Sequence, residues 1–215
     1  MYWSKQQLEK TNKIERLKLI NAISGIKPAN LVGTKATDGT SNLAIISSVL
    51  HLSSRPATMG FIMRPTQEIR RDTYHNICAT EVFSINHIPT NLIERAHYTS
   101  AKFPPEVSEF DTCGFTEKYL DGFEAPFVKE SPVQIGLSLC ECIPIKSSGT
   151  VLLVGSIEHL FITDEDVWDT EGYLNLEKTQ TAGIAGLNSY YKLAYLDSFP
   201  YARLHQIPEF NEKKS

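Results

Sequence analysis

The spacing of apolar residues divides the chain into a helical start followed by strands. Near the N-terminus four apolar residues recur at every third position: Ile14, Leu17, Ile20 and Ile23. This spacing predicts a helix over residues 4–23, with Ser4 as its N-cap. The spacing of apolar residues then changes from a helical to a strand-like pattern. Residues 31–37 are therefore predicted to form a strand that ends at the 38–39 Asp-Gly turn. Residues 43–52 are predicted as a second strand, apolar on both of its faces.

The rest of the chain continues with short elements separated by turn signals. Further strands are predicted over 59–63, 82–88, 133–140 and 151–162. Helices are predicted over 72–80, 91–98 and 184–196, and Asp72 is the expected N-cap of the first of them. Many strands and short helices, without regular alternation of the two, favour a mainly β fold: an antiparallel barrel decorated with helices.

Composition places the chain among ordinary globular proteins. Its 215 residues are 41% hydrophobic and 21% charged, which excludes disorder and a disulfide scaffold. A net charge of −4 argues against nucleic-acid binding, which usually needs a basic surface. No run approaches the ~18 apolar residues of a membrane helix. The first residues also lack the apolar region of a signal peptide, so we expect a cytoplasmic protein without membrane contact.

Several kinds of chemistry lack their sequence signature. Four cysteines occur without a CxxC spacing and are expected to be free, buried thiols: Cys78, Cys113, Cys140 and Cys142. Neither the dinucleotide fingerprint nor the nucleotide phosphate loop is present. No serine or cysteine has the context of a catalytic nucleophile, so we expect no catalytic side chain. The six histidines are scattered along the chain, so we expect no metal site.

One basic segment stands out in this acidic chain. Three arginines fall within eight residues just before the helix predicted over 72–80: Arg64, Arg70 and Arg71. A helix N-terminus offers unpaired backbone N–H groups to an anion, and arginine gives bidentate bonds to phosphate. Thr73 adds a hydroxyl donor in the first turn. The segment is either a phosphate site or a solvated basic turn, and local physics alone leaves both interpretations open.

A second segment, Ser41–Val49, combines small polar residues with apolar neighbours. In a strand that is apolar on both faces, such residues let a flat ligand lie against the backbone. Alternatively, Ser47 and Ser48 are buried hydroxyls that the sheet itself satisfies.

Taken together, the two segments resemble the flavin reductase-like family of FMN-binding split barrels. The strand motif of that family, Asn-x-Ala-x-x-Ser, matches Asn42, Ala44 and Ser47, and its basic-Asp-Thr-x-x-Asn-Ile motif matches residues 71–77. The resemblance continues through Phe83–Asn86, Ser100–Phe103, Ser108–Phe110, Glu130–Pro132 and Gly186–Tyr191, as ordered motifs from about residue 30 onward.

The resemblance implies a dimeric FMN-binding split β-barrel with the cofactor at the dimer interface. It implies cofactor contacts by Asn42, Leu43, Ala44, Ile46, Ser47, Ser48, Arg64, Pro65, Thr66, Arg71, Thr73, Asn76, Asn86, Ser100, Ala101 and Lys102. We expect residues 1–28 to form a helical extension, 29–196 the barrel domain and 197–215 a tail.

Three functions are compatible with this resemblance. The first is an NAD(P)H:flavin oxidoreductase, in which hydride passes to flavin N5. The second is an FMN-bearing electron carrier of the flavoredoxin type without nicotinamide activity, and the third is a non-catalytic flavin binder. The implied partners are a second copy of the chain, NAD(P)H or another electron donor, and a flavin-dependent oxygenase or other redox partner.

Lys102 is the candidate for tuning the flavin. It lies between the small Ala101 and Phe103, and Pro104-Pro105 stiffens the chain beyond it. The side chain is either an ordinary solvated lysine or a cation held over the pyrimidine edge of the flavin, where it would favour the reduced form.

Overall fold

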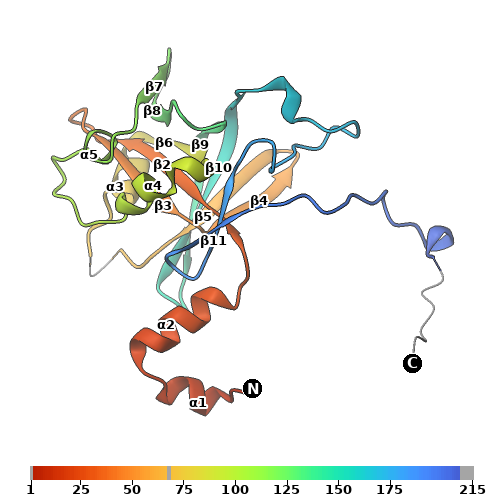
Figure 1. Cartoon of the computed structure of the whole chain (residues 1–215). Coiled ribbons are helices and arrows are strands. Elements are labelled where there is room, and N and C mark those ends of the chain that lie inside the picture. The colour runs from red at the N-terminus through yellow and green to blue at the C-terminus, as the bar shows by residue number, and fades with distance from the viewer. Residues whose placement is uncertain (1, 67–68, 209–215) are drawn as a thin grey trace.

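The computed structural model describes residues 2–66 and 69–208 and centres on a seven-stranded sheet (Figure 1). Across the sheet the strands are β3 (Ser41–Ile46), β2 (Asn30–Lys35), β6 (Val82–His87), β9 (Val133–Ile145), β10 (Thr150–Ile162), β5 (Ala57–Met63) and β4 (Val49–Ser54). All neighbouring pairs are antiparallel. The predicted mainly β architecture with short helices is therefore confirmed.

The two edge strands of this sheet, β3 and β4, follow each other directly in the chain. The single strand predicted over 43–52 is therefore wrong, because the chain leaves β3 after Ile46 and starts β4 at Val49. Ser48 makes the break: its hydroxyl donates to the Ile62 carbonyl at 2.9 Å and accepts from the Ile62 amide at 3.1 Å. Because the chain connects one edge directly to the other, the sheet curls into a barrel that stays open between them.

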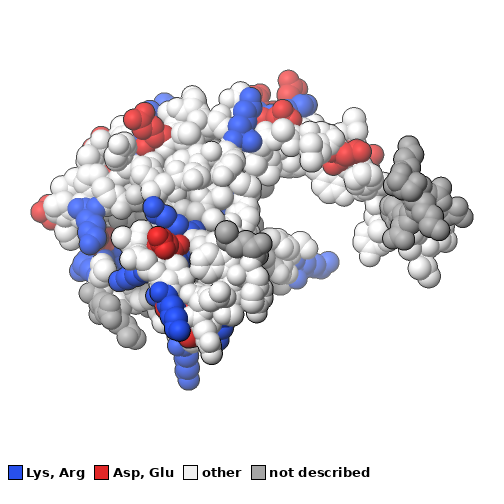
Figure 2. All heavy atoms as spheres, turned by 60° about the horizontal axis from the view of Figure 1, so that its bottom comes forward, with Lys and Arg blue, Asp and Glu red and all other residues white. Residues whose placement is uncertain are grey.

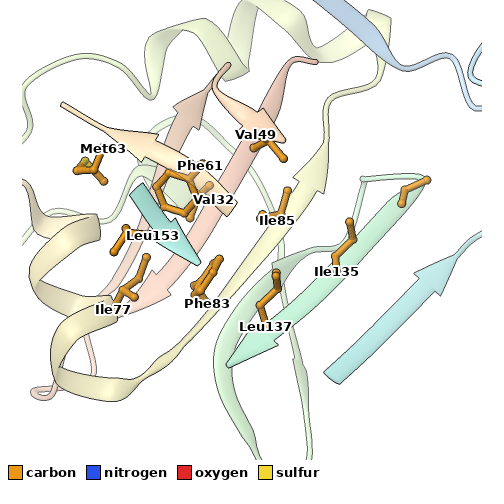
Figure 3. Packing of buried hydrophobic residues seen from close by; sticks show 11 residues of the cluster. Val32, Val49, Phe61, Met63, Ile77, Phe83, Ile85, Ile135, Leu137 and Leu153 are labelled. Atoms are coloured by element: carbon orange, nitrogen blue, oxygen red, sulfur yellow. The ribbon is translucent and has the colours of Figure 1, made fainter. Parts of the chain in front are cut away.

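The barrel interior is filled by side chains from opposite walls (Figure 3). Phe61 of β5 and Phe83 of β6 meet edge to face, with ring centroids 5.7 Å apart. Gly155 of β10 is required at this contact, since a Cβ there would lie 2.7 Å from the Phe83 ring. Ile77 joins the same cluster from the helix α3 (Asp72–Thr80), so the core anchors this helix to the barrel.

Short helices cover one side of the barrel. After α3, whose predicted bounds are confirmed, they are η1 (Thr90–Leu92), α4 (Ile93–Tyr98) and α5 (Glu109–Thr112). Two short helices follow later in the chain, η2 (Glu165–Val167) and η3 (Leu204–Gln206), and η3 belongs to the tail that runs away from the barrel (Figure 1). A second core lies where α4 and α5 meet β2 and β3, and it includes Leu31, Leu43, Ala96 and Phe110. A two-stranded ribbon extends this region: β7 (Glu117–Leu120) and β8 (Phe123–Val128).

The N-terminal arm consists of two helices, α1 (Lys5–Lys10) and α2 (Lys13–Ala22), instead of the single helix predicted over 4–23. Ser4 caps α1 as predicted. Asn12 breaks the helix because its side chain accepts a hydrogen bond from the Ile14 amide and so starts a new helix. The arm projects from the barrel, and its apolar residues at every third position are exposed (Figure 1).

The helix predicted over 184–196 is wrong. The chain forms a hairpin of β11 (Ala182–Ala185) and β12 (Ser189–Lys192), and β11 also pairs with β1 (Lys27–Pro28). Gly186, with φ +63°, makes the turn, and the pairing of Ile184 with Tyr190 brings the apolar residues together across the hairpin. Beyond the hairpin the described chain runs away from the barrel (Figure 1).

The cysteines are free, as predicted, but they are not buried. Cys78, Cys140 and Cys142 are exposed and Cys113 is half-buried. Cys140 and Cys142 are exposed because β9 continues beyond residue 140 into a hairpin with β10 that extends past the core. Cys78 is exposed on α3. None of the helices within the described ranges is long and apolar enough to cross a membrane.

Candidate functional site

The N-terminus of α3 has no side-chain cap. Arg71 occupies the N-cap position in an extended conformation, and its side chain makes no capping bond. The prediction of Asp72 as N-cap is wrong: Asp72 is the first helical residue, and its carboxylate accepts from Nε of Arg70 at 2.6 Å. The carboxylate is therefore turned away from the helix amides. These amides stay available to an external acceptor.

A hydrogen-bond network fixes this helix end against the edge of the sheet. The side-chain Nδ2 of Asn42, on β3, donates to Oγ1 of Thr34 and to Oγ1 of Thr73, both at 3.1 Å. The Asn76 amide donates to the same Thr34 oxygen at 3.2 Å. Because Thr73 accepts from Asn42, its hydroxyl hydrogen is free to point toward a further acceptor. The structure thus brings together Asn42, Thr73 and Asn76 as the sequence motifs predicted.

Sequence reasoning missed Thr34, the hub of this network. Thr34 is completely buried on β2 and lies directly opposite Asn42 in the register of β2 and β3. A threonine directly after the apolar run Leu31-Val32-Gly33 was the available signal. Only the pairing of the two strands shows why it is there.

The side chain of Arg71 leaves one polar atom unsatisfied. Its Nε is buried and has no hydrogen-bond partner among the described residues. A buried donor without an acceptor is costly, so the atom points to an acceptor that comes from outside the chain. On the face that carries the N-terminal arm, Lys and Arg are displayed more than Asp and Glu, although the chain is acidic overall (Figure 2). An anion fits this position.

The edge of β3 is sealed by residues that follow α4. The Leu43 amide donates to Oε2 of Glu109 at 2.9 Å, and the Ile45 amide donates to Oγ1 of Thr99 at 3.0 Å. Burial raises the pKa of the Glu109 carboxyl above its ordinary value. With its edge amides occupied, β3 can present only a face to a ligand.

The predicted residues of β3 and its exit have different surroundings. The Leu43 side chain is fully buried in the second core, whereas Ala44, Ile46 and Ser47 are half-buried. Ser48 is held by the Ile62 backbone, which favours the alternative interpretation of a hydroxyl satisfied by the sheet. Ala44, Ile46 and Ser47 are the positions left open to a flat ligand.

Asn86 does not join the candidate site. Its amide nitrogen donates to the Leu31 carbonyl and to Oγ of Ser84, and its oxygen accepts from the Val128 amide. The side chain is completely buried. Two of these bonds tie β6 to β2 and β8, so the structure gives Asn86 a structural role away from the other predicted cofactor contacts.

The remaining predicted residues lie in two exposed segments. Arg64 and Pro65 are exposed and Thr66 is half-buried beyond the end of β5. Ser100, Ala101 and Lys102 are exposed after α4, in a turn held by bonds from the Ser100 and Ala101 amides to the carbonyls of His97 and Tyr98. Lys102 therefore sits on a fixed turn, with no ion pair to another described residue.

Comparison with known structures shows the same fold in flavoproteins. A protein from Shewanella frigidimarina NCIMB 400, assigned by its name as a flavin reductase with a split barrel domain, is 38% identical, with a TM-score of 0.88 over 94% of this chain and all of that chain. Nitrilotriacetate monooxygenase component B from Bacillus cereus is 19% identical, with a TM-score of 0.81 over 93% of this chain and 98% of that chain.

Flavoredoxin of Desulfovibrio vulgaris (Miyazaki F) shares the fold at 21% identity, with a TM-score of 0.70 over 82% of this chain and 92% of that chain. The model of the flavin reductase like domain matches residues 26–177, which include β3, α3 and the turn after α4. With this match and the split barrel that the strands form, the chain belongs to the flavin reductase like domain family.

Proposed function

We propose that the protein binds FMN and catalyses the reduction of flavin by NAD(P)H. The observation that carries the proposal is the uncapped N-terminus of α3, where the buried Nε of Arg71 has no partner among the described residues and the Thr73 hydroxyl stands in the first turn. A phosphate monoester matches this donor set, because it offers several acceptor oxygens to a guanidinium, a hydroxyl and backbone amides. Membership of the family supports FMN as the bearer of that phosphate.

The chain contributes binding and orientation to this reaction. In the proposal, Arg71 and Thr73 hold the phosphate, while Asn42 positions Thr73 from β3. Ala44 leaves space on the strand for a flat ring system, and Lys102 brings a positive charge to its edge from the fixed turn. When bound, the flavin supplies the redox chemistry by accepting hydride at N5. No side-chain acid or base is needed for that transfer.

The proposed partners follow from the same reasoning. Electrons are supplied by NADH or NADPH and pass to an oxygenase or another redox partner. The similarity to nitrilotriacetate monooxygenase component B supports a partner of the oxygenase class. We also propose that the protein is a homodimer with the flavin at the interface.

Anaerobic reduction of the FMN-loaded protein tests the function. We expect NADH or NADPH to bleach the visible absorbance of the bound flavin. The nucleotide that reduces the flavin faster is the expected physiological electron donor. If neither donor bleaches a flavin that dithionite reduces, the protein is an electron carrier, as the likeness to flavoredoxin would suggest. If the protein binds no FMN at all, the proposed function is wrong.

A further inference from the structure

A hollow lies between α4 and α5, apart from the candidate phosphate position, and no predicted cofactor contact lines it. It has a volume of about 430 Å³ and is lined by Glu94, Arg95, Tyr98, Phe103, Thr112 and Cys113. This volume lies within the ~300–1,000 Å³ typical of small-molecule sites. None of the six lining residues is among the predicted cofactor contacts, although Phe103 is the last residue of the Ser100–Phe103 motif.

Two interactions hold Arg95 in this hollow, and a glycine leaves room for it. Its Nε donates to the Cys113 carbonyl at 2.9 Å, and its guanidinium lies over the Phe115 ring, 4.7 Å from the centroid. Gly114, with φ +71°, lies next to the Arg95 guanidinium, and a Cβ on Gly114 would lie 3.1 Å from Nη2 of Arg95. The guanidinium is thus fixed before any ligand arrives, which reduces the entropy that binding costs.

The outer edge of this guanidinium has no acceptor. Within residues 2–66 and 69–208, neither Nη atom of Arg95 makes a hydrogen bond, and no carboxylate lies within 4.0 Å. Arg70, by contrast, is paired with Asp72. A fixed fork of donors beside a hollow matches the two oxygens of a carboxylate.

The other walls restrict what the ligand can be. The rings of Tyr98 and Phe103 offer apolar surface to a flat group. Glu94 adds a negative charge at the same hollow, which disfavours a doubly charged ligand such as a phosphate. Burial raises the pKa of the Cys113 thiol, so it remains protonated and forms part of the wall without acting as a nucleophile.

We propose that this hollow binds a flat aromatic monocarboxylate, with its carboxylate on the Nη edge of Arg95 and its ring against Tyr98 and Phe103. The proposal does not depend on flavin reduction, because no residue of the phosphate position takes part. A ligand here would lie beside the turn that carries Lys102, since Phe103 follows that residue directly.

Saturation-transfer NMR with benzoate tests the proposal on the full chain, with and without FMN. We expect benzoate to bind in both states, and benzyl alcohol and inorganic phosphate to bind more weakly. Arg95→Gln should weaken benzoate binding by about tenfold or more, the loss typical of a charge-assisted hydrogen bond. Arg55→Gln, at an exposed arginine of the β4–β5 turn, is the matched control and should change nothing.

Two further variants keep the result interpretable if Arg95→Gln lowers stability. Arg95→Lys retains the charge but loses the fork, so it should bind benzoate less well than the parent. Tyr98→Ala removes a wall that is 59% exposed, so it should weaken benzoate without unfolding the chain. Unchanged benzoate binding in these variants overturns the proposal. Equal binding of phosphate also overturns the proposal, because it would show a general anion site. Displacement of benzoate by FMN overturns it as well, because the hollow would then be part of the cofactor site.

Discussion

Thr73 combines a structural role with a proposed binding role in one residue. It is only 5% exposed and accepts a hydrogen bond from Asn42 of β3, yet it stands in the first turn of α3, where the amides are open. Arg71 precedes it with a buried, unsatisfied Nε. At the scale of single residues, the site thus consists of donors already held in place by the fold, for which only the acceptor must be supplied.

Replacing Arg71 or Thr73 with alanine should weaken FMN binding without unfolding the barrel. Each variant removes a hydrogen bond to a charged group, worth ~1.5–3 kcal/mol, which corresponds to a loss of affinity of roughly tenfold to hundredfold. Titration of the apoprotein with FMN, followed by flavin fluorescence, measures the change. The exposed Arg55, replaced by alanine, serves as control; unchanged affinity in both site variants would contradict the anion position.

Lys102→Met should lower the midpoint potential of bound FMN. A positive charge beside the ring stabilises the reduced, anionic flavin more than the neutral oxidised form, so removing it makes reduction harder. Oxidised-FMN affinity should stay nearly unchanged, because methionine keeps most of the side-chain volume. Spectroelectrochemical titration with FMN fully bound measures the potential, and a constant midpoint would identify Lys102 as an ordinary solvated lysine.

At the scale of elements, β3 is an edge strand that other elements protect. Glu109 of α5 and Thr99 after α4 occupy its outward amides, while β2 pairs with its other edge. A free edge would offer itself to strands of other chains, so this cover prevents unwanted pairing. The same cover leaves the face of β3, near α3, as the surface for a ligand.

The end of β6 carries a pH-dependent contact with the β11 region. Burial lowers the pKa of His87 from 6.5 to about 4, and its Nδ1 lies 3.2 Å from Oγ1 of Thr181. Between these two pKa values the unfolded chain binds more protons than the folded chain. We therefore expect this contribution to stability to be nearly complete above pH 6.5 and to fall as the pH drops, by about 2 kcal/mol at pH 5.

His87→Gln should remove most of this acid sensitivity, because glutamine cannot take up the proton. Urea unfolding at pH 7 and pH 5 measures the difference in the free energy of unfolding. His51→Gln, at an exposed histidine of β4, is the control and should keep the parental dependence on pH. The same pH dependence in the parent and in His87→Gln would show that other groups cause it.

At the scale of the whole molecule, both ends of the chain leave apolar surface uncovered. On α2 the residues Ile14, Leu17, Ile20 and Ile23 are all exposed. In the described part of the tail, Leu196, Phe199, Tyr201 and Leu204 are each more than four-fifths exposed, and the tail extends away from the barrel (Figure 1). Several large apolar side chains exposed on one segment often mark an interface.

We expect a homodimer, with a mass in light scattering of twice the 24.1 kDa of one chain. Joint replacement of Leu17 and Ile20 with glutamate should shift the protein toward the monomer, because it charges the exposed apolar side of α2. Lys18→Glu adds a negative charge to the same helix and serves as control. A monomer that still holds FMN would contradict an interface site for the cofactor.

Local patterns along the chain were sufficient for some elements. The bounds of α3, the Asp-Gly turn after β2 and most strands follow from apolar spacing and turn residues, which act within a few positions. The strand and helix motifs also placed Asn42, Thr73 and Asn76 in one candidate site. These three residues lie on the motifs themselves, so their grouping could be anticipated before the fold was known.

Other features depended on contacts between distant segments. Ser48 breaks a strand because Ile62 lies beside it, and residues 184–192 form a hairpin because β1 supplies the pairing edge. The side-chain amide of Asn86 is occupied by hydrogen bonds to β2 and β8. The sequence by itself determined most of the elements and the donor types, since both arise largely from short-range preferences. The tertiary structure alone decided which donors stay unsatisfied, because that depends on every neighbour the fold brings to them.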